Sequence, residues 1–196
     1  MRTTLVFAFL ILIYPHIAIA QEMEPAFSRS WNLDSQKTIF VLINSESEIS
    51  DSKQTIIHDV IMSKKSVTLD DKNYFEGWQG ALGQIYYSDD APKLVFTDVE
   101  KPSNMIFINF VDESSKFSGL TKIILNENKI VQSHITIYNS KNLTDVEFKK
   151  ILCHEFGHSL GLTHSQDIND IMFPVLEQSN QLISNNDIHE LSLLYR

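Results

Sequence analysis

The sequence has little cysteine, little basic charge and, after its first 20 residues, no long apolar run. One cysteine among 196 residues excludes an internal disulfide, so an exported form would depend on its core and on metal for stability. Acidic residues number 25 against 16 basic ones, and the formal net charge is −9. This acidity argues against nucleic acid and anionic membranes as partners. No later stretch is apolar enough to span a bilayer.

The first 20 residues have a composition of their own. Arg2 precedes a continuously apolar run from Leu5 to Ile13, and Ala18-Ile19-Ala20 offers a cleavage site flanked by small residues. We therefore expect residues 1–20 to be a secretory signal peptide. The rest, residues 21–196, is then one secreted domain without membrane attachment. The alternative, an uncleaved membrane anchor, is disfavoured because the apolar run is shorter than a span requires.

One stretch of the chain carries metal chemistry. His154 and His158 are four residues apart, so on a helix they share one face and can chelate one ion. Gly161 can adopt the left-handed conformation that ends a helix, which lets the chain fold back and bring His164 in as a third ligand. Three neutral imidazoles with a fourth position open are typical of a catalytic zinc.

Glu155 follows the first ligand and is the predicted general base. Zinc lowers the pKa of a bound water to about 7, and a neighbouring carboxylate can then take its proton. The alternative to a metal site is a chance pattern of satisfied histidines. For this composition, three His, one Glu and one Gly at these offsets arise by chance on the order of 10⁻⁵. On a helical wheel Cys153 points away from the ligands, so we expect a buried small hydrophobe and not a nucleophile.

Hydrophobic patterns predict an α/β chain with a mixed, mostly parallel sheet. The expected strands are 37–44, 93–97 and 105–111, followed by a hairpin of 120–125 and 133–138. Helices are expected over 52–64, from Asp70 to the break at 89–92, and from the capping box of Thr144 and Glu147.

The string His-Glu-x-x-His-x-x-Gly-x-x-His with a downstream Met172 resembles the metzincin signature. Ser165 after the third histidine, the turn 171–174 and the segment 184–195 make the chain most similar to the matrixins, the matrix metalloproteinases and their microbial relatives. The resemblance implies an α/β (α+β) zincin-like catalytic domain. Its twisted mixed sheet would have about five strands, with an antiparallel edge strand, an active-site helix and a C-terminal helix.

The resemblance also implies a secreted zinc endopeptidase that acts as a monomer on protein or peptide substrates. Met172 would form an apolar floor beneath the zinc. Gly119-Leu120-Thr121 would open the edge strand that binds substrate by strand addition, and Pro174 to Leu176 would line the pocket for the residue after the cut. The alternative function is a catalytically silent zinc-binding module that holds a peptide partner along the same edge strand.

Some matrixin features have no match. Residues 21–36 are too few for a prosegment, and the only cysteine lies in the active helix, so latency through a cysteine switch is not expected. The His-x-Asp motif of the structural zinc site is absent between 111 and 119, and His134 nearby is expected to be an ordinary strand residue. Asp112-Glu113 could hold calcium, with a solvated loop as the alternative.

Overall fold

The computed structural model describes residues 28–33, 37–45, 49–85, 91–101, 103–175 and 179–195. Two predictions lie outside the described residues: the signal peptide over 1–20 and the substrate-pocket role of Leu176. None of the helices in the described part has both the length and the apolar character needed to cross a membrane.

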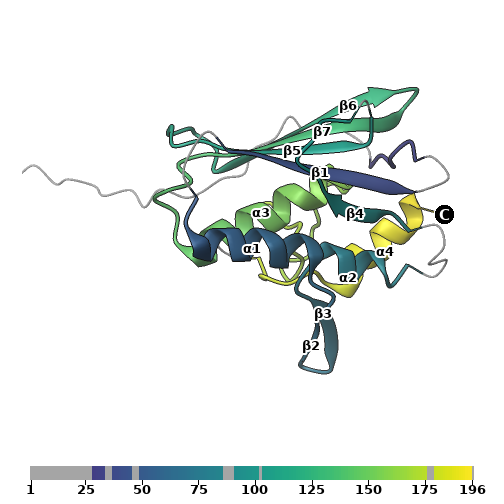
Figure 1. The fold of residues 1–196 in the computed structure, drawn as a ribbon. Helices are drawn as coiled ribbons and strands as arrows, with labels where there is room; N and C mark the ends of the chain where they lie inside the picture. The colour runs from purple at the N-terminus through teal and green to yellow at the C-terminus, as the bar shows by residue number, and fades with distance from the viewer. Residues whose placement is uncertain are drawn as a thin grey trace, which may run out of the picture.

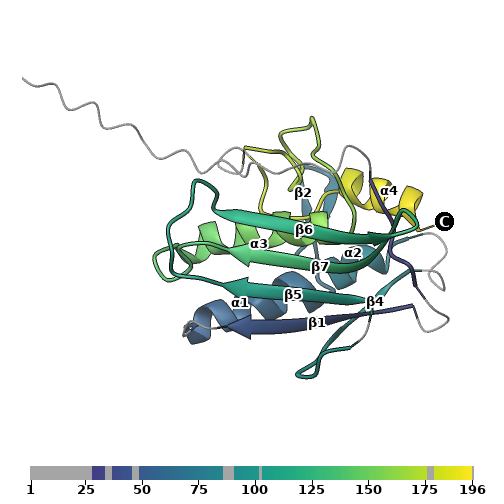
Figure 2. The same ribbon diagram turned by 90° about the horizontal axis from the view of Figure 1, so that it is seen from above.

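A five-stranded sheet forms one layer of the fold. Its strand order is β4-β1-β5-β7-β6, and the first four strands run parallel while β6 is antiparallel to β7 and forms an edge (Figure 2). The predicted mixed sheet with an antiparallel edge strand is thus confirmed. The strands are β1 (Thr38–Ser45), β4 (Lys93–Phe96), β5 (Met105–Phe110), β6 (Gly119–Asn126) and β7 (Lys129–Ile137).

The β6–β7 hairpin has a tighter turn than the sequence suggested. Glu127 and Asn128 both have positive φ, 48° and 65°, as in the two-residue turns whose twist matches that of paired strands. β7 therefore begins at Lys129, four residues before the predicted start at Ser133. A register shift between residues 124 and 125 lets the buried Ile130 pair within the same ladder.

The helices all cover one face of this sheet, as Figure 1 shows: α1 (Asp51–Met62), α2 (Trp78–Leu82), α3 (Asp145–Ser159) and α4 (Asn185–Leu194). Helix α3 packs under β6 and β7 and runs beside α1. Period-two alternation along β5 turns Ile106, Ile108 and Phe110 into the layer between sheet and helices, where all three are buried. The core therefore fixes α3 directly beneath the edge strand.

The predicted helix starting at Asp70 is wrong. Residues Ser66–Leu69 and Lys72–Phe75 form the antiparallel strands β2 and β3, which project from the helical side of the molecule (Figure 1). Asp70 and Asp71 have φ of 48° and 60° and make the two-residue turn between them. Acidic residues suit a helix start, but Asp also tolerates the left-handed region, and strand pairing decided between the two. Only the short α2 remains helical.

Candidate metal centre

Helix α3 begins where its capping box predicts. The Thr144 hydroxyl accepts a hydrogen bond from the Glu147 amide, and the Glu147 carboxylate accepts one from the Thr144 amide at 2.8 Å. These two hydrogen bonds satisfy two amides that a helix start leaves without partners. The Thr144 hydroxyl also donates to the Glu147 carboxylate at 2.7 Å, and this side-chain hydrogen bond, followed by that from the Thr144 amide, holds the pKa of Glu147 below its ordinary value. The capping box therefore sets where the helix begins, and with it the direction in which the histidines point from the helix axis.

Gly161 ends the helix for two physical reasons. Its φ is +100°, a conformation that costs glycine little. A Cβ at this position would also lie only 1.7 Å from the carbonyl oxygen of Arg29. The chain before the sheet thus crosses the helix end at backbone distance, and the Arg29 amide donates to the Gly161 carbonyl at 3.2 Å. At Gly161 the close approach of Arg29 therefore requires glycine as much as the turn does.

Side chains from both ends of the described chain cap the last carbonyls of α3. The indole Nε1 of Trp31 donates to the Ser159 carbonyl at 2.8 Å, and the Tyr195 hydroxyl donates to the Leu160 carbonyl at 2.8 Å. All of these groups are buried, so each hydrogen bond satisfies an acceptor that water cannot reach. The turn that leads to His164 is therefore held from outside the helix.

The three predicted metal ligands come together. The Nε2 atoms of His154 and His158 are 2.9 Å apart, and those of His154 and His164 are 3.3 Å apart. His154 and His158 are buried, and His164 is half-buried. Two nitrogens bound tetrahedrally to one zinc at 2.0–2.1 Å lie about 3.3 Å apart, close to these two separations. The ligand atoms of all three histidines lie within 4.8 Å of one another, so the triad could share one ion.

The partners of the other ring nitrogens define the tautomers. Nδ1 of His154 lies 2.8 Å from the Ile171 carbonyl, and Nδ1 of His158 lies 2.8 Å from the Leu162 carbonyl. A carbonyl only accepts, so each Nδ1 carries the proton and each neutral ring turns an Nε2 lone pair toward the other. Burial, and then the neighbouring His158, lowers the pKa of His154, which keeps it neutral. Two lone pairs at 2.9 Å fit a cation held by both.

Met172 lies against α3, and the turn that carries it is tied to a carboxylate that the sequence did not single out. Asp170 is buried and accepts hydrogen bonds from the hydroxyls of Ser165 and Ser184 and from the side-chain amide of Asn186. The loop after His164, the Met172 turn and the start of α4 are thereby joined at one group. An acidic residue directly before the apolar pair Ile171-Met172 was the available signal. The three residues that donate to Asp170, which are Ser165, Ser184 and Asn186, are spread along the chain and form no recognisable sequence motif.

Glu155 is fully buried and lies against the edge strand. The Thr121 hydroxyl donates to its carboxylate Oε2 at 2.7 Å, and a Cβ on Gly119 would lie 2.5 Å from its Oε1. Leu120, between them, faces the opposite side of the sheet because side chains alternate along a strand. Two of the residues predicted to bind substrate therefore contact the predicted base.

The remaining candidates have ordinary surroundings. Cys153 is fully buried, and burial raises the pKa of its thiol, which confirms that it is a packed residue. His134 lies in β7, where its ring stacks on Phe107 at 4.7 Å. Pro174 is half-buried. Asp112 pairs with Lys141, and the histidine triad is the only group of three or more potential ligands found among the described residues, so calcium stays a prediction.

A mixed sheet with an antiparallel edge strand, over a helix that presents two of three clustered histidines, defines the class of metzincin metalloproteases. The family model described as Matrixin matches residues 16–196, and the chain belongs to the matrixin family of zinc metalloproteases. Both the predicted family and the predicted fold class are confirmed.

Collagenases and a matrilysin are among the relatives. The chain is 32% identical over 114 residues to an interstitial collagenase of Aquarana catesbeiana, covering 53% of this chain and 30% of that protein. It is 39% identical over 57 residues to an interstitial collagenase of Bos taurus, 29% of this chain and 12% of the other. A matrilysin of Felis catus is 40% identical over 53 residues, 26% and 20% of the two chains. The chain thus spans less than a third of the length of these relatives.

A solved structure of myroilysin covers 91% of both chains at 13% identity with a TM-score of 0.49. That similarity is too low to add to the family assignment.

Proposed function

We propose that this protein is a secreted zinc-dependent endopeptidase. One observation carries the proposal: three imidazole Nε2 atoms converge, and the Nδ1 atoms of His154 and His158 are held by backbone carbonyls, so those two Nε2 lone pairs are ready for a metal. His154, His158 and His164 would hold zinc. When bound, zinc supplies Lewis-acid polarisation of the scissile carbonyl. Membership in the matrixin family supports zinc as the ion.

Glu155 would carry the proton through the reaction. It removes a proton from the attacking water, and it later delivers that proton to the nitrogen of the leaving amine. The carboxylate is buried, so bulk water does not screen it or compete for its proton. Met172, buried beside α3, would keep the floor of the site dry.

The substrate would lie extended along β6. This strand forms an edge of the sheet, and β7 pairs with only one of its sides, so its other backbone groups can bind an added strand. Gly119, Leu120 and Thr121 are proposed to contribute their backbone to this pairing. Pro174 and Leu176 are proposed to line the pocket for the residue after the cut. Residues 1–20 are proposed to direct export, and the enzyme is proposed to act as a monomer on proteins or peptides.

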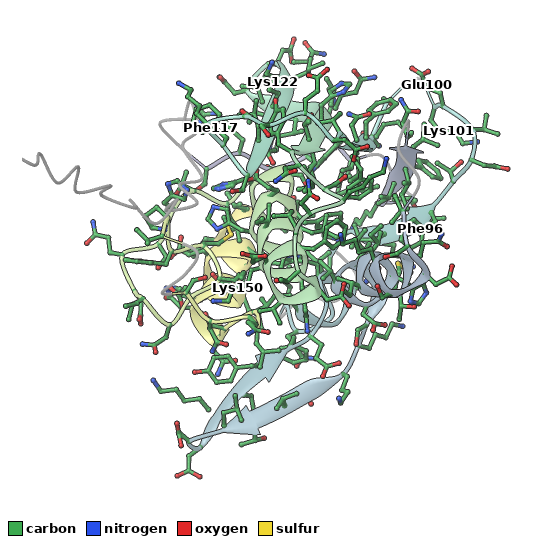
Figure 3. All side chains as sticks on the ribbon, turned by 90° about the vertical axis from the view of Figure 1, so that its left-hand side faces the viewer. Phe96, Glu100, Lys101, Phe117, Lys122 and Lys150 are labelled. Atoms are coloured by element: carbon green, nitrogen blue, oxygen red, sulfur yellow. The ribbon has the colours of Figure 1, made fainter. Side chains whose placement is uncertain are left out.

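The test is the Glu155→Gln variant, measured for both zinc content and cleavage of a casein-type substrate. We expect a full complement of zinc and a loss of cleavage of about 100-fold or more, because the amide cannot take a proton. Glu100→Gln is the matched control. Figure 3 shows Glu100 on the same side of the molecule as Phe96 and at a distance from Lys122, which lies on β6. Retained cleavage in Glu155→Gln would refute the assigned role, and a zinc-loaded wild type that binds but never cuts peptides would favour a silent module.

A further inference from the structure

Two residues of the edge strand form a seat for the Glu155 carboxylate. Gly119 and Thr121 are two positions apart on β6, so they face the same side of the strand, toward α3. Gly119 leaves room: the Cβ of any other residue would lie 2.5 Å from Oε1 and 2.7 Å from Cγ of Glu155. Thr121 supplies the contact, with its hydroxyl 2.7 Å from Oε2. The seat depends on one missing side chain and one hydroxyl.

The hydroxyl of Thr121 is well suited to orient this carboxylate. A second acceptor, the backbone carbonyl of Glu155, lies 3.0 Å from the same Oγ1, so both possible hydrogen bonds end on one residue. Threonine is branched at Cβ and has few χ1 rotamers, which limits where the hydroxyl can point. A hydroxyl that donates to an ionised carboxylate forms a short and strong hydrogen bond. Glutamate has three rotatable side-chain bonds, and this contact restricts their freedom.

We infer that Thr121 is a positioning residue for Glu155: its hydroxyl holds the carboxylate in the orientation required for proton transfer, in the space that Gly119 leaves open. This inference rests on the proposed function. It also gives β6 a second role, because the strand proposed to bind the substrate backbone then holds the base as well. The reacting water, the peptide and the carboxylate are aligned against one rigid element.

The test compares two substitutions of similar size. Thr121→Val keeps the shape and removes the hydroxyl, whereas Thr121→Ser keeps the hydroxyl. We expect kcat to fall about 10- to 100-fold in Thr121→Val, with KM within about twofold, and to recover in Thr121→Ser to within about threefold of wild type. Zinc content should be unchanged in both. Thr136→Val is the matched control on the neighbouring strand, because Thr136 pairs with Leu120 and faces the other side of the sheet.

A second readout does not depend on activity. A double-mutant cycle combines Thr121→Val with Glu155→Ala and follows urea unfolding of the metal-free protein. We expect the shifts of the unfolding midpoint to be non-additive, with the double variant less destabilised than the sum of the single ones. Additive shifts would overturn the contact between the two side chains.

The outcomes separate this inference from the function on which it rests. A wild type that is inactive on all peptides overturns the proposed function, whatever the cycle shows. An active wild type with Thr121→Val equally active overturns the positioning role alone. Equal loss in the Val and Ser variants also overturns it, because the hydroxyl would then not be the group that matters.

Discussion

Gly157 and Met172 are in contact such that a Cβ atom on Gly157 would lie 2.3 Å from the Met172 Sδ. The same Cβ would lie 3.0 Å from Cζ2 of Trp78, whose indole Nε1 donates to the Cys153 carbonyl. The helix that carries two of the metal ligands therefore meets the methionine turn and a buried tryptophan at a position where a Cβ would have to displace the Met172 side chain.

Gly157→Ala should displace Met172 and destabilise the fold. We expect a loss of about 1–3 kcal/mol in the free energy of unfolding, the usual cost of an extra group in a filled core, together with weaker zinc binding. Urea unfolding and a zinc competition titration would measure both. Gly83→Ala is the control, because its Cβ would make only ordinary contacts at 3.4 Å and 3.5 Å. Equal stability of the two variants would contradict the packing argument.

His158→Ala should abolish stable metal binding. Only His154 and His164 would remain, and two imidazoles do not make a closed protein site for zinc. The variant should also lose the stabilisation that zinc gives the folded state, so added zinc should raise the melting temperature of wild type but not of this variant. His58→Ala, on the exposed face of α1, is the control. A normal zinc content in His158→Ala would remove the residue from the ligand set.

Asp170→Ala should lower the free energy of unfolding by more than the small loss of side-chain volume would explain. It would leave the hydroxyls of Ser165 and Ser184 and the amide of Asn186 without their shared buried acceptor. We expect a loss of about 2–4 kcal/mol in the free energy of unfolding. Asp167→Ala changes an exposed acid in the same loop and should lower the free energy of unfolding much less. Chemical denaturation of both variants checks this, and equal costs would show that Asp170 does not hold the three segments together.

Asp187 should make stability depend on pH. Burial raises the pKa of this carboxyl in the folded protein to about 7, whereas the unfolded carboxyl titrates near its ordinary value of about 3.9. Between these values the folded state keeps a proton that the unfolded state has lost. The stabilisation is therefore complete below about pH 4 and is lost as the pH rises to about 7, with a slope of about 1.4 kcal/mol per pH unit.

Asp187→Asn should remove this part of the pH dependence. Denaturation of the metal-free protein between pH 4.5 and pH 8 would measure the free energy of unfolding of wild type and variant. The difference between the two isolates the contribution of Asp187, because the contributions of the other titrating groups cancel. Glu190→Gln, an exposed substitution on the same helix, is the control. A difference between wild type and Asp187→Asn that stays constant across this range would show that the carboxyl does not titrate there.

The two-aspartate turn shows where sequence patterns fail. Asp70-Asp71 and the spacing of Phe75, Trp78 and Leu82 fit a helix as well as a strand followed by a short helix. Phe75 and Trp78 are buried as the pattern requires, but from two different elements. Periodicity identifies which side chains face the core, and the strand pairing of residues 66–75 then determined the backbone.

The sequence by itself determined the local geometry of the metal centre. Helical spacing puts His154 and His158 on one face, the capping box sets where α3 begins, and Gly161 ends it, because all three act over a few residues of chain. Only the tertiary structure decided which carbonyls orient the imidazoles, that Thr121 would meet Glu155, and that Asp170 would join three segments. Those contacts connect residues that are close only after the sheet and helices have packed, and no local pattern encodes such distances.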